Sequence, residues 1–110
     1  MIVVRITLNV IPEKQLEVMQ TLVSMIEPTG KEAGCISYCV VCDIKDKNCF
    51  SLLEEWKTRE NLVQHLMSYR FGILMGISTL LCKPLEISIH TVSRSEGIET
   101  IAKARTKAAL

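Results

Sequence analysis

The chain has no long hydrophobic run. None of its apolar stretches approaches the roughly 18 to 20 residues that a helix needs to cross a bilayer. Near the N-terminus, Arg5, Thr7 and Asn9 interrupt the hydrophobic side chains, which is not typical of a signal peptide. We therefore expect no membrane partner and no export, and hence a soluble, cytoplasmic protein.

Net charge and aromatic content are also low. There are 13 Lys and Arg against 12 Asp and Glu, for a formal charge of +1, and aromatic residues make up 5% of the 110 residues. Without a long-range field to attract polyanions, nucleic acid is not expected as a partner. The apolar fraction of 48% excludes a disordered chain and indicates a single aliphatic domain with its own core.

The five cysteines are an odd number within apolar sequence, which favours reduced, buried thiols over a disulfide framework. Cys39 and Cys42 have the spacing of a metal-binding pair. The residues between them, Val40 and Val41, favour an extended strand instead, in which the two sulfurs point to opposite faces. We expect no metal site. No glycine-rich phosphate loop is present, so no nucleotide cofactor is implied. We expect the protein to use no cofactor.

Alternating apolar and polar side chains predict four strands, over residues 2–10, 35–42, 49–56 and 85–90. Apolar residues at steps of three and four predict a helix over residues 13–27, interrupted by Pro28 and Gly30. Thr58 is a suitable N-cap for a second helix. Residues 71–81 form a further helix or a covered irregular segment.

The order strand, helix, strand, strand, helix, strand predicts an α+β fold, the ferredoxin-like split unit with an antiparallel sheet. Helices cover one face of such a sheet. The other face would carry an exposed apolar patch, formed by Val3, Ile36 and Val40 or by the residues that alternate with them along the strands. We therefore expect a homodimer joined through the sheet faces. Residues 1–93 form this domain. Residues 94–110 form a tail with a modest amphipathic helical pattern, either solvated or packed across a partner subunit.

Two polar side chains occupy faces that are otherwise apolar. Glu54 shares a strand face with Leu52 and Trp56, so its carboxyl group is solvated at the sheet edge, paired with a basic group, or used as an acid or base with a raised pKa. His65 shares a helical face with Leu62. An imidazole in this setting is either a hydrogen-bonded structural group or a proton acceptor, and the sequence leaves both open.

A further set of residues has a characteristic order and spacing. It comprises Glu27-Pro28-Thr29, Gly34-Cys35, Tyr38, Phe50, Glu54, Trp56, His65 and Phe71. In this order the set resembles the antibiotic biosynthesis monooxygenase domain family, over about residues 2–93. The resemblance implies a dimeric α+β barrel in which two ferredoxin-like subunits join their sheets, each keeping a pocket between sheet and helices.

Members of this family differ in chemistry, so the fold alone does not define a reaction. Some are monooxygenases that act on phenols or quinols without metal or flavin, whereas others degrade haem or act on small signalling sugars. Haem degradation ranks low for this chain, because Val4 stands near the family's Asn position and residues 73–78 contain no His. Many quinol-type members have His-Phe where this chain has Arg70-Phe71, which leaves a cation that could bind an anionic substrate or pair with Glu54.

The leading hypothesis implied by the resemblance is a cofactor-independent monooxygenase acting on a quinol or a similar electron-rich phenol. His65 would be the base or its hydrogen-bond anchor, Trp56 would stack on the substrate ring, and Asn9 would orient oxygen or a carbonyl group. The substrate-binding residues would be Tyr69, Phe71, Met67, Glu54 and Arg70. The alternative is a non-catalytic dimeric small-molecule-binding or scaffold domain, in which Trp56 and His65 only pack the helices onto the sheet.

Overall fold

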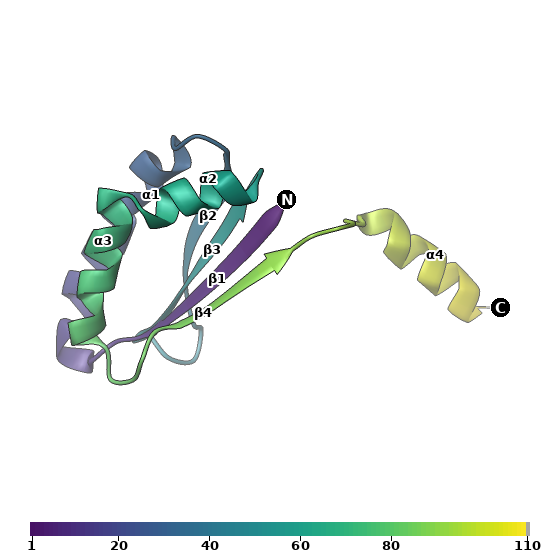
Figure 1. The fold of residues 1–110 in the computed structure, drawn as a ribbon. Coiled ribbons are helices and arrows are strands. Elements are labelled where there is room, and N and C mark those ends of the chain that lie inside the picture. The colour runs from purple at the N-terminus through teal and green to yellow at the C-terminus, as the bar shows by residue number, and fades with distance from the viewer. Residues whose placement is uncertain (110) are drawn as a thin grey trace.

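The four segments predicted as strands form one antiparallel sheet in the computed structural model, which describes residues 1–109. The strands are β1 (Ile2–Asn9), β2 (Cys35–Cys42), β3 (Cys49–Trp56) and β4 (Glu86–Thr91). Their order across the sheet is β2-β3-β1-β4. This order places β1 and β3, the two strands whose inward-facing side chains are buried, at the centre of the sheet (Figure 1).

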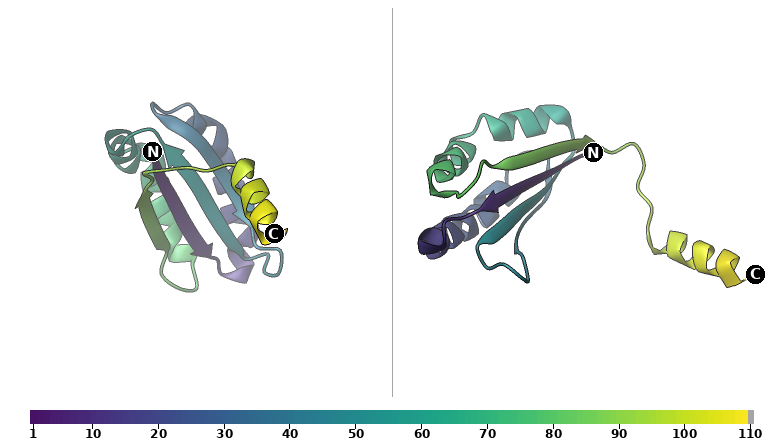
Figure 2. Two further views of the ribbon diagram at one scale, coloured as in Figure 1. Left: turned by 90° about the vertical axis from the view of Figure 1, so that its right-hand side faces the viewer. Right: turned by 90° about the horizontal axis from the view of Figure 1, so that it is seen from below.

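Residues 1–109 form six helices, and all but the last lie in the connections between the strands, on one side of the sheet (Figure 1). They are the 3₁₀ helix η1 (Pro12–Lys14), α1 (Gln15–Gly30), α2 (Arg59–Leu66), α3 (Tyr69–Gly76), the 3₁₀ helix η2 (Ile77–Leu80) and α4 (Ile98–Ala109). Helices α1, α2 and α3 cover one face, and the opposite face of the sheet is open (Figure 2). The prediction of a ferredoxin-like α+β fold is therefore confirmed.

The first helix is longer than its sequence pattern predicts. Helix α1 continues to Gly30 with Pro28 inside it, whereas the pattern predicts an interruption at Pro28. Proline lacks an N–H, so its place in the last turn costs only one helical hydrogen bond. The next residue, Thr29, is buried against the core and holds that turn in place, and the Lys31 N–H bonds to the Pro28 carbonyl.

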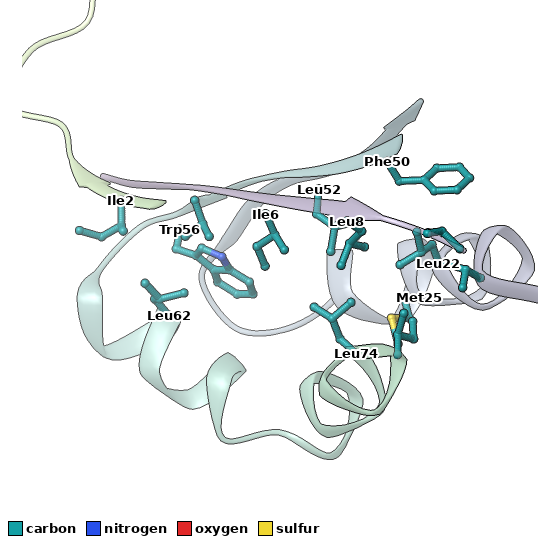
Figure 3. Packing of buried hydrophobic residues seen from close by; sticks show 14 residues of the cluster. Ile2, Ile6, Leu8, Leu22, Met25, Phe50, Leu52, Trp56, Leu62 and Leu74 are labelled. Carbon is teal, nitrogen blue, oxygen red and sulfur yellow. The ribbon is translucent and has the colours of Figure 1, made fainter. Parts of the chain in front are cut away.

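The core lies between the covered sheet face and helices α1 to α3 (Figure 3). Strand residues alternate between this face and the open face, as their period of two requires. The labelled side chains in Figure 3 show the packing: Leu22 and Met25 come from α1, Leu62 from α2 and Leu74 from α3, and they meet Ile6, Leu8, Leu52 and Trp56 of the sheet. Burying each large aliphatic side chain contributes roughly 1.5 to 3 kcal/mol.

The open face carries an apolar patch, defined here as Val3, Cys39, Val41 and Leu53. Cys39, Val41 and Leu53 are exposed and Val3 is half-buried. Val40, by contrast, lies opposite Leu52 on the covered face, so it does not contribute to the patch.

The C-terminal segment leaves the body at the end of β4. Residues 92–97 connect to α4, which lies on the open side of the sheet, away from α1 to α3 (Figure 2). Side chains 98–108 are exposed. Within residues 1–109, no helix is both long and apolar enough to span a membrane.

Gly34 fixes the approach of α2 to the turn before β2. Its φ of +78° lies in the left-handed region, and a Cβ placed on it would clash with the side chain of Asn61. Its carbonyl accepts a hydrogen bond from the N–H of Lys57 at 2.8 Å. This position therefore requires glycine for both its conformation and its space.

We predict that Gly34→Ala lowers the free energy of unfolding by about 1 to 3 kcal/mol, because alanine adds both backbone strain and the Asn61 clash. Gly72→Ala is the matched control, since Gly72 lies in α3 with open space around its Cβ position. It should be neutral or stabilising. Urea unfolding of the two variants measures the difference, and equal effects would contradict this role for Gly34.

Candidate functional site

The centre of the candidate site is a stack of two rings between the sheet and α2. The imidazole of His65 lies over the indole of Trp56, with ring centroids 4.5 Å apart and planes inclined by 28°. The indole Nε1–H donates a hydrogen bond to Glu54 Oε1 at 2.9 Å. Trp56, Glu54 and His65 are 0%, 1% and 3% exposed. A carboxyl group and an imidazole are thus enclosed by apolar and aromatic side chains.

A second carboxylate, Glu32, lies on the other side of His65. Glu32 Oε1 is 3.0 Å from His65 Nδ1, and Glu32 Oε2 accepts a hydrogen bond from Arg70 Nε at 3.3 Å. His65 Nε2 lies 3.6 Å from Glu54 Oε1, beyond normal hydrogen-bond distance. The imidazole is therefore flanked by two carboxyl groups, of which only Glu32 is paired with a cation.

Local capping places these side chains. The Thr58 hydroxyl accepts the Asn61 N–H at 3.1 Å and starts α2, so His65 falls on the buried side of that helix, as predicted. Ser68 then accepts the Phe71 N–H at 3.2 Å and starts α3. Its hydroxyl also donates to the His65 carbonyl at 2.7 Å. The corner between the two helices consequently brings Phe71 edge-on to His65, with centroids 5.4 Å apart.

A small cavity adjoins the imidazole. Its lining residues are Met25, Thr29, Tyr38, His65, Arg70, Phe71 and Leu74. The empty volume is about 170 Å³, distributed so narrowly that a water-sized sphere does not fit. The cavity is therefore closed in this conformation, with aromatic walls and the partly exposed Arg70 at its surface side.

Burial alters the acidity of two groups at the site. Desolvation is the largest cause that raises the pKa of Glu54; the Glu32 charge adds to it, while the Trp56 hydrogen bond and His65 oppose it. Desolvation, followed by the charges of Glu54 and Glu32, raises the pKa of Tyr38. Both shifts favour the protonated form, so this site retains protons that an exposed carboxyl or phenol would release.

Five of the eight predicted site residues come together here, namely His65, Trp56, Glu54, Phe71 and Arg70. Two expected contacts differ. Trp56 was expected to stack on a substrate ring, but its face is covered by His65 and none of it is exposed. Arg70 pairs with Glu32 and not with Glu54, because Glu32 lies at the surface side of the imidazole.

The structure places the other three predicted residues elsewhere. Asn9 pairs with Cys49, whereas Trp56 pairs with Ile2 at the opposite end of β1, about 23 Å away at the usual strand rise. By the alternation of side chains along β1, Asn9 also belongs to the open face of the sheet, on the side away from the helices. Met67 and Tyr69 are 73% and 86% exposed, because the break between α2 and α3 turns them outward.

Glu32 is the site residue that the sequence analysis missed. It lies in the polar segment between α1 and β2, which is typical of a solvated turn. Its one sequence signal is its place two residues before the Gly34-Cys35 turn. Across residues 1–109, no cluster of three or more His, Cys, Asp and Glu side chains has an arrangement that could hold a metal ion.

Fold and site together define a ferredoxin-like α+β domain with a carboxyl group and an imidazole enclosed between sheet and helices. The family model of the antibiotic biosynthesis monooxygenases matches residues 1–72, and the chain belongs to this family. Sequence relatives are an uncharacterised protein, sll1783, of Synechocystis sp. and a Bacillus subtilis protein, YcnE, named as a candidate monooxygenase. The first is 34% identical over 88% of this chain and 67% of its own length; the second is 28% identical over 79% and 93%.

Solved structures agree on the fold. A conserved protein from Methanosarcina mazei superposes with a TM-score of 0.76 at 39% identity, covering 81% of this chain and 89% of its own. A Deinococcus radiodurans protein, described as a candidate antibiotic biosynthesis monooxygenase, gives a TM-score of 0.82 at 23% identity over 89% and 98% of the two chains.

The raised pKa of Glu54 predicts a stability that depends on pH. A folded-state pKa above the ordinary value of 4.5 means that the folded protein binds more protons, so this contribution is complete below pH 4.5 and is lost as pH rises through the folded-state pKa. Relative to Glu54→Gln, the free energy of unfolding of the wild type should fall by up to about 1.4 kcal/mol per pH unit in that window. Urea unfolding of both proteins from pH 4.5 to 7.5 measures this, and a constant difference would contradict it.

Proposed function

We propose that this protein is a cofactor-independent monooxygenase that oxidises a quinol or another electron-rich phenol in the cavity beside His65. The observation that carries the proposal is the imidazole Nε2, which is buried among aromatic side chains and has no hydrogen-bond partner within residues 1–109. A buried, unpartnered acceptor is costly unless a ligand uses it. The phenolic O–H is a donor of the required kind.

The chemistry needs a base and a site without water. Loss of the phenolic proton to His65 gives a phenolate, which passes one electron to O2. The two radicals combine at a ring carbon, and loss of water leaves the oxidised ring. One oxygen atom enters the ring and the other leaves as water, with all four electrons supplied by the substrate. An apolar cavity keeps the radical pair together and excludes competing protons.

Substrate entry requires the cavity to open. Phe71 and Arg70 of α3 line the cavity, which has no room for a water-sized sphere, whereas ligand pockets usually enclose roughly 300 to 1,000 Å³. Within residues 1–109, the Arg70 side chain makes one hydrogen bond, through Nε, so its terminal nitrogens are available to an anionic or carbonyl oxygen of a ligand.

The closed cavity also favours a second candidate function. In a non-catalytic binding or scaffold domain, Trp56 and His65 would hold the helices onto the sheet, and the complete burial of Trp56 fits that role. The two functions differ in turnover, because only the first needs a proton acceptor at Nε2.

For the assembly, we propose a homodimer joined through the open sheet face, with each subunit keeping its own cavity. Val3, Cys39 and Leu53 of the apolar patch line one shallow hollow across β1, β2 and β3, and exposed apolar patches on small domains mark interaction surfaces. We also propose a cytoplasmic location, since all five cysteines are free thiols.

Oxygen uptake tests the proposed activity. With reduced benzo- and naphthoquinols, chelator and no added cofactor, the wild type should consume oxygen above the autoxidation blank, with saturation in substrate. His65→Ala should lower kcat by about 10²- to 10⁴-fold, the usual contribution of a general base. His90→Ala is the matched control, because His90 is exposed on β4 and its loss should leave turnover unchanged. Rates equal to the blank for every protein would favour the binding domain.

Light scattering after size exclusion tests the dimer. We predict that Leu53→Asp dissociates it, because the substitution places a charge in the apolar patch. Ile44→Asp is the matched control, since Ile44 is 99% exposed in the loop between β2 and β3. A monomeric wild type, or a Leu53→Asp protein of unchanged mass, would contradict the proposed interface.

A further inference from the structure

Glu32 joins the buried imidazole to the protein surface. Its two oxygens have different partners: Oε1 contacts His65 Nδ1 at 3.0 Å, and Oε2 accepts from Arg70 Nε at 3.3 Å. The side chain of Glu32 is mostly buried, and that of His65 is almost completely buried. The backbone also holds Glu32 in place, because its N–H donates to the Thr29 carbonyl at 3.0 Å and its carbonyl accepts the Cys35 N–H at 3.1 Å.

These contacts decide which ring nitrogen carries the proton. Glu32 Oε2 forms an ion pair with the guanidinium group of Arg70, whose charge is permanent. An ionised carboxylate only accepts hydrogen bonds, so the 3.0 Å contact requires an N–H at Nδ1 of His65. In the neutral ring the lone pair is then on Nε2, the atom that has no partner. The other nitrogen cannot take this role while Glu32 holds Nδ1.

Within residues 1–109, no group on the Nε2 side forms a hydrogen bond with that lone pair. Glu54 Oε1 already accepts the Trp56 N–H, and it lies 3.6 Å from Nε2, too far for a hydrogen bond. Phe71 and Tyr38 approach the ring edge-on, with centroids 5.4 and 6.3 Å away. These contacts position the ring without occupying Nε2.

We propose that Glu32 is a positioning residue, which fixes His65 in the tautomer protonated at Nδ1 so that Nε2 is the atom that accepts the substrate proton. This inference rests on the proposed function for its catalytic consequence. In the step it serves, the phenolic O–H bond breaks and an Nε2–H bond forms. The resulting imidazolium is stabilised by the Glu32 carboxylate on its Nδ1 side, while Arg70 offsets the charge of Glu32 in the resting state.

The tautomer can be measured without any turnover. Long-range ¹H–¹⁵N spectra of ¹⁵N-labelled protein at about pH 8.5, roughly two units above ordinary imidazole titration, distinguish a protonated ring nitrogen from one with a lone pair. His90→Asn assigns the signals, because the chain has two histidines. The wild-type spectrum should show His65 protonated at Nδ1. A ring protonated at Nε2 would overturn the proposal.

Two substitutions separate positioning from packing. Glu32→Gln keeps an amide oxygen that accepts the Nδ1–H, so it should retain the wild-type tautomer. Glu32→Ala removes the acceptor and should give a ring with mixed protonation. In the oxygen-uptake assay, Glu32→Ala should lower kcat at least about tenfold with little change in KM, and Glu32→Gln should recover part of the loss. An unchanged tautomer in Glu32→Ala would overturn the role of Glu32.

The tautomer spectrum and the oxygen-uptake assay test the two proposals separately. A wild type with the Nδ1–H tautomer and its loss in Glu32→Ala, but no oxygen uptake, would support the positioning role and reject the proposed oxidation. Uptake that depends on His65, with the Nε2–H tautomer in the wild type, would support the oxidation and reject the role of Glu32. Should Glu32→Ala not fold, the wild-type and Glu32→Gln spectra still decide the tautomer.

Discussion

The stack of His65 on Trp56 is the contact on which the rest of the site depends. It joins α2 to the end of β3. The carboxyl group of Glu54, which accepts the indole N–H of Trp56, is buried beside it. Burying Glu54 beside this stack is costly, and the single indole hydrogen bond offsets only part of the cost. The balance is visible in the raised pKa of Glu54.

The site is therefore a place where local stability is given up. A core made only of aliphatic side chains would be more stable at the position of Glu54, yet the site keeps two buried polar atoms without partners within the described residues, His65 Nε2 and Glu54 Oε2. Such groups are concentrated at functional sites, since a ligand can complete their hydrogen bonds. The surrounding sheet, in which Val4, Ile6 and Leu52 are fully buried, provides the stability that tolerates this arrangement.

Much of the fold could be read from residue patterns, because alternation and helical spacing record which side of each element meets the core. The strands β2 and β3 begin and end where the pattern predicts, and Thr58 caps α2. The extension of α1 through Pro28 could not be read in this way. The local preference of proline to interrupt a helix is weaker here than the burial of Thr29, which is a tertiary effect.

The sequence by itself determined the α+β order of elements, the apolar faces, the shared strand face of Glu54 and Trp56, and the place of His65 on the apolar face of a helix. Only the tertiary structure decided which of the polar residues meet. Glu32 reaches His65 across 33 positions of sequence, whereas Asn9 lies at the far end of β1. Periodicity specifies the side of an element on which a residue lies, but the distance between residues on different elements depends on how those elements pack.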